Sequence, residues 1–385
     1  MSARMNILVD GRVWSKNAAG ITTFLTCALR EWADQWKAAV FYVLLPKGVD
    51  PAIEMGTLPD NIRLLDYSGK FPRRLPNIVI LQRLVPKLCK ELKINIYYSP
   101  VPHLPWGIPA SVKTMVTVHD VVNIEMADTM AWTNRLASGL FFSKAIQKAD
   151  FLWTNSLYTK SKVEQYFPNR RCGQIFVGDA ADRTLFYPRH LTQEEKQQVR
   201  TLYGIENKFI LFVGSLEPRK NLSFLLELIP ELYARHGVQL VVVGGKGWKN
   251  SAIKEVVEAP SFPKQSTVFC GYISNEELAM LYNTADCFVS AALMEGFGMP
   301  QLEALQCGCP VVTADNTAMT EVASGKQGAV LVKEYNPADW IRAIMSVLES
   351  RPEVVAEQFK QYDWTLIIRQ LTECITSKVP GYVVR

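Results

Sequence analysis

Two glutamates mark the part of the chain whose residue types could do chemistry. Glu295 and Glu303 stand on either side of a glycine turn at residues 296–298, and an apolar run at residues 287–290 precedes them. Carboxylates accept hydrogen bonds from sugar hydroxyls, and a pair of them can also catalyse glycoside hydrolysis. The apolar run predicts a buried strand, and parallel sheets bind ligands where their strands end. That position favours a binding cradle over hydrolysis.

A helix is expected directly after the glycine turn. Pro300 suits the first turn of a helix and Gly308 suits its end, which predicts a helix over residues 300–307 with Glu303 in its first turn. Free N–H groups at such a start bind phosphate or sugar oxygens, and glycines let the ligand approach. The alternative is that the glycines only turn the chain and Glu303 complements the helix dipole. A single glycine favours that alternative, whereas the whole arrangement favours a ligand site.

A second glycine turn carries two adjacent cations. Residues 214–221 read GSLEPRKN and follow a predicted strand at residues 209–213. Arg219 and Lys220 would stand at a helix entrance, where they could neutralise a diphosphate leaving group. The alternative is a solvated basic turn. Because this turn and the glutamate loop both follow strands, we expect them to share one site.

Other strand ends carry weaker signals. His119 follows a predicted strand at residues 115–118 and is as readily structural as functional on position alone. Gly20 opens a helix after the first strand, a geometry suited to lining a diphosphate site. The pair Gly244-Gly245 also follows a strand but lacks the G-x-G-x-x-G pattern, which argues against NAD binding.

Strands and helices alternate along the chain in two series. Runs typical of buried strands stand at residues 5–9, 39–45, 62–65, 94–98, 115–118 and 151–154, and again at 209–213, 240–243, 267–270, 287–290, 310–313 and 329–332. This alternation predicts parallel sheets covered by helices on both faces. We expect an α/β protein with two Rossmann-like doubly wound domains at residues 1–188 and 189–362. A C-terminal helix at residues 363–385 is expected to pack back on the first domain.

Length and composition agree with two globular domains. The chain has 385 residues, 48% of them hydrophobic, and a formal net charge of +5, too small to indicate nucleic acid binding. The eight cysteines have neither zinc-ligand nor disulfide spacing, which favours a reducing compartment. The longest apolar run, residues 38–45, is far shorter than the about 20 residues of a membrane-spanning helix. We therefore expect a cytoplasmic protein.

The C-terminal half resembles the retaining glycosyltransferases of family 4, glycosyl transferases group 1. These enzymes have the GT-B fold, in which two Rossmann-like domains face each other across a cleft. The segment EGFGMPQLE reproduces the paired-glutamate motif of that family, and TVHD, GSLEPRKN and CGYISNEELAMLYNTADCFVSAALMEGFGMPQLEALQCGCPVV occur in the expected order. The resemblance is tight from residue 209 to residue 332 and looser before it.

The resemblance implies roles for these residues. The catalytic residues would be Glu295, His119 and Lys220, of which the first two bind the donor sugar and the lysine the diphosphate. Nucleoside contacts would come from Glu303 at the ribose and from Gly271 and Tyr272 near the base. The donor diphosphate and sugar would also meet Gly20, Gly214, Ser215, Arg219, Gly296, Phe297, Gly298 and Met299. Many family members have arginine at the position of Ser215, and here Arg219 would replace it.

The implied chemistry is glycosyl transfer with retention of anomeric configuration. The departing diphosphate helps to deprotonate an acceptor hydroxyl that arrives on the same face of the sugar. The protein contributes positioning and stabilisation of the leaving group. No Asp-x-Asp triplet occurs in the chain, and Arg219, Lys220 and the helix start could neutralise the diphosphate. We therefore predict a reaction that needs no metal and no cofactor beyond the donor.

The expected function is transfer of a hexose from GDP-mannose or a UDP-hexose to a hydroxyl of a glycan or lipid-linked acceptor. The pathway would build cell-surface polysaccharide, lipopolysaccharide or glycolipid. Two alternatives stay open: another GT-B enzyme, such as a nucleotide-sugar epimerase or a disaccharide synthase, and a non-catalytic subunit that binds glycan or a partner. The glutamate pair, His119 and the basic turn disfavour the latter, because the fold alone requires none of them.

Residues 70–93 form the densest basic stretch of the chain, with seven Lys or Arg against one Glu. An apolar face accompanies it, formed by Leu81, Leu84, Val85, Leu88 and Leu92, and Pro86 would kink or restart the helix. The preferred interpretation is a surface helix packed on the first sheet. The alternative is attachment to an anionic membrane surface, at the cytoplasmic face, through Arg73, Arg74, Arg83 and Lys87.

Overall fold

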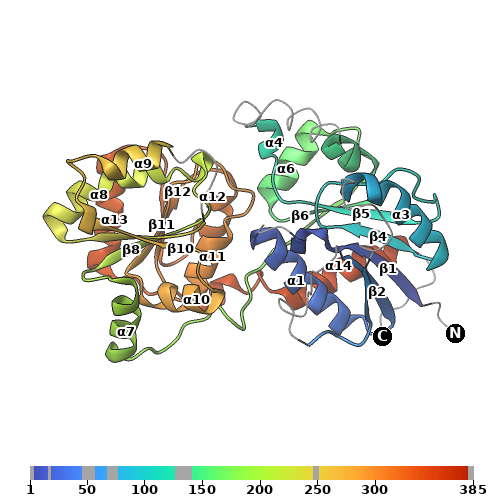
Figure 1. Cartoon of the computed structure of the whole chain (residues 1–385), viewed down its shortest axis with the longest axis horizontal. Helices are drawn as coiled ribbons and strands as arrows, with labels where there is room; N and C mark the ends of the chain where they lie inside the picture. Colours follow the sequence, from blue (N-terminus) through green and yellow to red (C-terminus); the bar gives the residue numbers. More distant parts are fainter. Residues whose placement is uncertain are drawn as a thin grey trace. The chain divides into compact units, whose positions relative to one another are not determined.

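The computed structural model describes residues 4–15, 19–45, 57–66, 77–125, 141–245 and 251–379. The chain divides into two compact units (Figure 1). The first consists of Met1–Ala180 and Tyr362–Arg385, and the second of Ala181–Gln361. Each unit has its own parallel sheet, so the predicted α/β class with two Rossmann-like units is confirmed.

The first sheet has the strand order β3-β2-β1-β4-β5-β6-β7. Its strands are β1 (Met5–Asp10), β2 (Ala39–Leu45), β3 (Ile62–Asp66), β4 (Ile96–Ser99), β5 (Lys113–Val118), β6 (Phe151–Thr154) and β7 (Ile175–Val177). Every pairing in it is parallel. Six strands match predicted apolar runs, and the three-residue β7 is too short to give a periodic signal.

Helices cover both faces of the first sheet. They include η1 (Gly11–Ser15), α1 (Ala19–Gln35), α3 (Asn77–Glu91), α4 (Val122–Glu125), α6 (Leu157–Tyr166) and α14 (Trp364–Lys378). The C-terminal helix α14 lies beside α1 in Figure 1, and the rings of Phe24 and Trp364 are 5.3 Å apart. The Nε2 amide of Gln35 donates to the carbonyl oxygen of Thr365. The last segment of the chain therefore completes the first unit.

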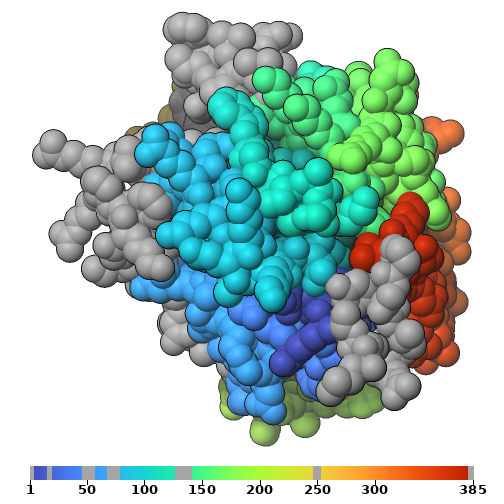
Figure 2. All heavy atoms as spheres, turned by 90° about the vertical axis from the view of Figure 1, so that its right-hand side faces the viewer, coloured from blue at the N-terminus to red at the C-terminus, as the bar shows by residue number. Residues whose placement is uncertain are grey.

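Helix α3 packs its apolar face on the first sheet. Leu81 and Val85 are fully buried with Leu8 of β1 and Tyr97 of β4. The helix runs unbroken from Asn77 to Glu91 with Pro86 inside it, so the predicted restart is wrong. Figure 2 faces the surface that carries α3, in light blue to cyan, on which Arg83 and Lys87 are exposed. The surface-helix interpretation holds for this segment, whereas Arg73 and Arg74 lie outside the described residues.

The second sheet has the order β10-β9-β8-β11-β12-β13, and every pairing is parallel. Its strands are β8 (Phe209–Val213), β9 (Gln239–Val243), β10 (Thr267–Gly271), β11 (Cys287–Ser290), β12 (Val311–Ala314) and β13 (Ala329–Val332). The helices of this unit include α7 (Gln193–Tyr203), η3 (Pro218–Lys220), α8 (Leu222–His236), α9 (Ser251–Glu258), α10 (Asn275–Thr284), α11 (Met299–Gln306), α12 (Thr317–Ala323) and α13 (Pro337–Ser350). The chain order reverses between β8 and β11, which makes their adjacent ends the switch point of the sheet.

The segment before α7 belongs to the second unit. The chain divides after Ala180, eight residues before the predicted boundary at 188. Phe186 is 2% exposed and packs against Tyr282 of α10, and the backbone N–H of Arg189 donates to Asn283. The residues before Phe186 are mostly polar, and a polar stretch is typical of a linker. The sequence therefore predicted a linker up to residue 188, whereas the second unit begins at Ala181.

Within the described residues, no helix is long and apolar enough to cross a membrane.

Candidate functional site

Two loops meet at the switch point of the second sheet. Strands β8 and β11 are hydrogen-bonded neighbours, so the loops that follow them leave the same edge side by side. The backbone N–H of Leu293 donates to the carbonyl oxygen of Arg219 at 2.7 Å, which ties one loop to the other. The basic turn and the glutamate loop, 75 residues apart in sequence, are therefore one structure.

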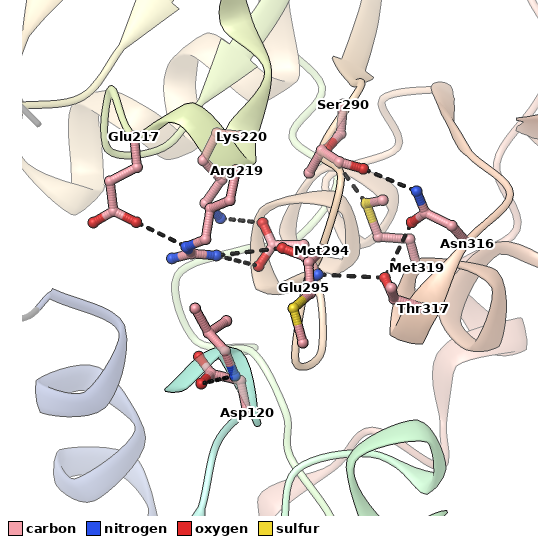
Figure 3. Close-up of polar contacts among 12 residues, drawn as sticks. Asp120, Glu217, Arg219, Lys220, Ser290, Met294, Glu295, Asn316, Thr317 and Met319 are labelled. Carbon is pink, nitrogen blue, oxygen red and sulfur yellow. Dashed lines mark hydrogen bonds and ion pairs between the residues drawn. The ribbon is translucent and has the colours of Figure 1, made fainter. Parts of the chain in front are cut away.

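The carboxylate of Glu295 faces both cations of the basic turn (Figure 3). Lys220 Nζ donates to Oε1 of Glu295, and Arg219 Nη1 donates to Oε2 at 3.3 Å. Arg219 also bonds Glu217 through Nε at 2.7 Å. Burial opposes ionisation of Glu295, but the charges and hydrogen bonds of Lys220 and Arg219 outweigh it and hold the pKa of this carboxyl below its ordinary value. The site thus holds an ionised glutamate and two cations in a largely buried place.

Polar side chains after β12 hold the other side of the glutamate loop. The backbone N–H of Glu295 donates to Oγ1 of Thr317 at 3.3 Å, and Asn316 Nδ2 donates to the carbonyl oxygen of Ala292. The hydroxyl of Tyr335 donates to the same carbonyl at 2.8 Å. Sequence reasoning missed these residues. Asn316 and Thr317 follow β12, the strand next to β11. Polar residues at a strand end could have indicated that they belong to the site.

Helix α11 begins one residue earlier than predicted. Gly298 is its N-cap, with a φ of 90° that favours glycine, and Met299 is its first residue. Glu303 consequently lies in the second turn of the helix, so its predicted place in the first turn is wrong, and the alternative that it only complements the helix dipole loses support. Phe297 is 4% exposed, so its ring packs in the interior and offers no surface to a ligand.

Glu303 has a different partner from Glu295. The hydroxyl of Tyr282, on α10, donates to Oε2 of Glu303 at 2.9 Å. Burial raises the pKa of Glu303 to about 7, although the tyrosine hydrogen bond opposes the rise. The two glutamates therefore have different environments: Glu295 belongs to an ion cluster, whereas Glu303 is a buried carboxyl whose pKa is raised to about 7.

Glycines end the three strands on the other side of the switch point. Gly214, Gly244 and Gly271 follow or end β8, β9 and β10, and the backbone N–H of Gly244 donates to the carbonyl oxygen of Gly271 at 2.8 Å. Gly271 has a φ of +70°. Tyr272 beside it is 76% exposed, which leaves its ring open to a planar ligand. Ser215 follows Gly214 and accepts a backbone hydrogen bond from Glu217.

His119 directly follows β5 in the first unit. Its Nε2 lies 2.8 Å from the carbonyl oxygen of Pro100, and since a carbonyl only accepts, Nε2 carries the proton. Burial lowers the pKa of His119 to about 4, and its ring stands edge-on to Phe24 at 4.8 Å. The imidazole is thus neutral at physiological pH and offers Nδ1 as an acceptor. Gly20 is exposed in the first turn of α1, with open space where a Cβ would be.

The first sheet has a polar cluster at its own switch point, between β1 and β4. Arg12 donates to both carboxylate oxygens of Asp10 and lies 3.2 Å from Nδ1 of His103. Asp10 and His103 are 1% and 6% exposed. Sequence reasoning missed this cluster, because it joins residues 91 positions apart.

Comparison with known proteins shows which family part of this chain matches in sequence. Residues 193–363 match the family model described as glycosyl transferases group 1. The chain is 27% identical over 331 residues to the O-antigen chain mannosyltransferase B of Escherichia coli, with 81% of each protein covered. It is 24% identical to the serotype-specific mannosyltransferase WbdA of Escherichia coli over 65% of this chain, which is 30% of that protein.

Among solved structures, HepE of Anabaena in complex with UDP and glucose is similar with a TM-score of 0.74. The two share 16% sequence identity over 97% of this chain and 100% of that one. Two Rossmann-like units with this strand order give the chain the GT-B fold. The match to the glycosyl transferases group 1 lies almost entirely in the second unit of the chain.

Proposed function

We propose that this protein is a retaining hexosyltransferase of family 4. It moves a hexose from a nucleotide diphosphate sugar to a hydroxyl of a glycan or lipid-linked acceptor in the biosynthesis of cell-surface polysaccharide, lipopolysaccharide or glycolipid. The observation that carries the proposal is the buried cluster of Lys220, Arg219 and Glu295 at the switch point of the second sheet. Buried ion pairs add little to stability compared with apolar packing, so a functional role accounts for it better.

The donor diphosphate is the ligand that this cluster suits. Lys220 and Arg219 supply positive charge at Glu295, in the loop that leads into α11, and the N-terminus of α11 at Gly298 has no side-chain cap. Both features favour an anion. Glu295 holds the cations in place in the empty state and accepts hydrogen bonds from sugar hydroxyls when the donor is bound. Glu303 takes the ribose, and Gly271 and Tyr272 take the base.

Retention follows from attack on the face that the leaving group occupies. The bond between the anomeric carbon and the diphosphate oxygen breaks, and the acceptor oxygen bonds to the same carbon. The acceptor proton passes to the departing diphosphate. Lys220 and Arg219 stabilise the charge that develops there, which is where fixed cations have their largest effect. His119 binds the donor sugar, with Nδ1 accepting a hydroxyl, and Gly20 leaves room for the diphosphate.

The same cations support a reaction without a divalent metal. Lys220 and Arg219 neutralise the charge that Mg²⁺ or Mn²⁺ would otherwise neutralise. Activity that persists in excess EDTA would agree with this, and activity that disappears and returns with Mn²⁺ would contradict it.

The names of two similar proteins support the two donors that we propose. The O-antigen chain mannosyltransferase B is named for mannose, and the HepE structure contains UDP and glucose. We propose GDP-mannose first and a UDP-hexose second. A thermal-shift panel of UDP, GDP, ADP and CMP tests the choice, followed by analysis of the products formed from the sugars of the stabilising nucleotide. The anomeric configuration of the product decides retention.

Donor hydrolysis separates this proposal from a binding subunit. Purified protein should release nucleoside diphosphate slowly from its donor, and Glu295→Ala and Lys220→Ala should abolish the release. A non-catalytic subunit would bind without any release. An epimerase would convert the donor sugar instead of transferring it, and product analysis would show this.

A further inference from the structure

Tyr282 is buried beside the carboxyl that we assign to the ribose. Its side chain is 0% exposed, and its ring packs against Phe186 at 5.9 Å and Phe288 at 6.0 Å. These contacts fix the ring from two sides, so its hydroxyl has one direction available. That hydroxyl donates to Oε2 of Glu303.

The hydrogen bond from Tyr282 occupies one of several acceptor positions of the Glu303 carboxylate. A carboxylate has two oxygens with two lone pairs each, and within the described residues Tyr282 donates to one of these oxygens. Glu303 is 8% exposed, so part of it still reaches the surface. A buried carboxylate with too few hydrogen-bond donors lowers the stability of the folded protein. The retention of Glu303 at this place therefore points to a polar ligand that supplies the missing donors.

We propose that Tyr282 is the positioning residue for Glu303: its hydroxyl fixes Oε2 so that Oε1 accepts hydrogen bonds from the ribose hydroxyls of the donor. The inference rests on the proposed function. Tyr282 does not touch the nucleotide, and it acts through the carboxyl. Its hydrogen bond also lowers the pKa of Glu303 against the rise that burial causes, because a donor to the carboxylate stabilises the charged form.

Helix α10 links this bond to the base-binding side. The strand end at Gly271 and Tyr272 leads directly into α10, whose start is fixed by a capping box between Ser274 and Glu277. Tyr282 stands at the other end of the same helix, which packs against α11. One rigid element therefore sets the base-side turn and the ribose carboxylate relative to each other.

The other ionisable groups near this pair stay neutral or fixed. Burial raises the pKa of Cys307 to about 12 and the pKa of Cys309 well above its ordinary value. The charge of Arg189 lowers the pKa of Cys307 but does not outweigh burial. Glu303 is thus the group at this place that titrates near pH 7.

The test compares ribonucleotides with nucleotides that lack the hydroxyls. Binding of GDP, UDP and the 2′,3′-dideoxy form of each is measured by calorimetry on the full chain. In Tyr282→Phe, the affinity for the bound ribonucleotide should fall about tenfold, whereas the dideoxy form should bind as it does to wild type. KM for the donor should rise with little change in kcat. The pH at which ribonucleotide affinity is half-maximal should move upward.

Tyr166→Phe, which removes a tyrosine bond to Glu125 in the first unit, is the matched control and should behave as wild type.

Two results would overturn the inference alone: equal loss for ribonucleotide and dideoxynucleotide in Tyr282→Phe, or no loss for either. A wild type that binds neither GDP nor UDP would overturn the proposed function and this inference with it. Should Tyr282→Phe fold poorly, Glu303→Gln with and without Tyr282→Phe leaves no buried charge unpaired. A residue that acts through Glu303 adds no further loss of ribonucleotide affinity in that background, and an added loss would contradict the proposal.

Discussion

A Cβ atom on Gly244 would lie 1.9 Å from the carbonyl oxygen of Gly214. The two glycines end neighbouring strands of the second sheet, and the backbone N–H of Gly214 in turn donates to Val243. Gly244 also has a φ of +151°, which L side chains rarely adopt. The turn that carries Arg219 and Lys220 therefore starts from a backbone contact that only glycine permits.

Gly244→Ala should consequently destabilise the protein and displace the basic turn. We expect a loss of more than about 2 kcal/mol in the free energy of unfolding, because the clash is with backbone and cannot be relieved by a side-chain rotation. Urea unfolding measures it. Gly245→Ala is the matched control, since a Cβ there meets nothing within 4 Å. Equal free energies of unfolding for the two variants would contradict the close approach of Gly244 to the carbonyl oxygen of Gly214.

Glu303→Gln should stabilise the folded protein at high pH while it weakens nucleotide binding. The folded-state pKa of Glu303 is raised from 4.5 to about 7, so the folded protein retains a proton that the unfolded chain loses between these values. Stability is therefore lost as the pH rises from 4.5 to 7, and the glutamine variant does not suffer this loss. We expect it to be more stable by up to about 3 kcal/mol at pH 8 and equal to wild type near pH 4. Unfolding curves that differ by a constant amount at all pH values would contradict the assignment.

Gly20→Ala should separate a role in binding from a role in folding. The added Cβ has open space and stands at the exposed start of α1, so stability should stay the same or rise by up to about 1 kcal/mol. If the donor diphosphate occupies that space, kcat/KM falls at least about tenfold. Full activity in a stable variant would remove Gly20 from the donor site.

The basic surface of the first unit gives a prediction about membranes. Arg83 and Lys87 project from the exposed side of α3, whose other side is buried on the sheet. The alternative of membrane attachment predicts co-sedimentation with anionic liposomes, weakened when Arg73, Arg74, Arg83 and Lys87 are neutralised, at about 1 kcal/mol for each residue, whereas a surface helix alone predicts none. The control neutralises four exposed cations of the second unit, namely Lys208, Arg235, Lys254 and Lys264. Binding unchanged by the first set would exclude this surface.

The sequence allowed the strands to be predicted because both sheets are parallel. Strands buried on two faces read as short apolar runs, and β2, β6 and β11 have the predicted bounds. The glutamate loop and the basic turn could be paired for the same reason, since each follows a strand. The start of α11 was misplaced because Pro300 is a familiar first residue, whereas here the positive φ of Gly298 already turns the chain.

Contacts across the fold could not be predicted in this way. The bond from Tyr282 to Glu303 joins two helices whose relative rotation no periodicity gives. The cluster of Arg12 and His103 depends on β1 lying next to β4, an order that single-sequence patterns leave open. Local patterns predict the elements, and the partners of buried polar groups depend on how those elements pack.

The central claim is that Lys220 and its cluster bind and activate a nucleotide-sugar donor. The direct test is release of nucleoside diphosphate from GDP-mannose and UDP-glucose by wild type, Lys220→Met and Lys254→Met. Lys220→Met keeps the aliphatic stem and removes the charge, and the exposed Lys254 of α9 is the matched control. The account predicts turnover of one donor by wild type and by Lys254→Met, with kcat/KM lower by at least about 100-fold in Lys220→Met. Equal turnover by the two variants, or none by wild type with either donor, would contradict it.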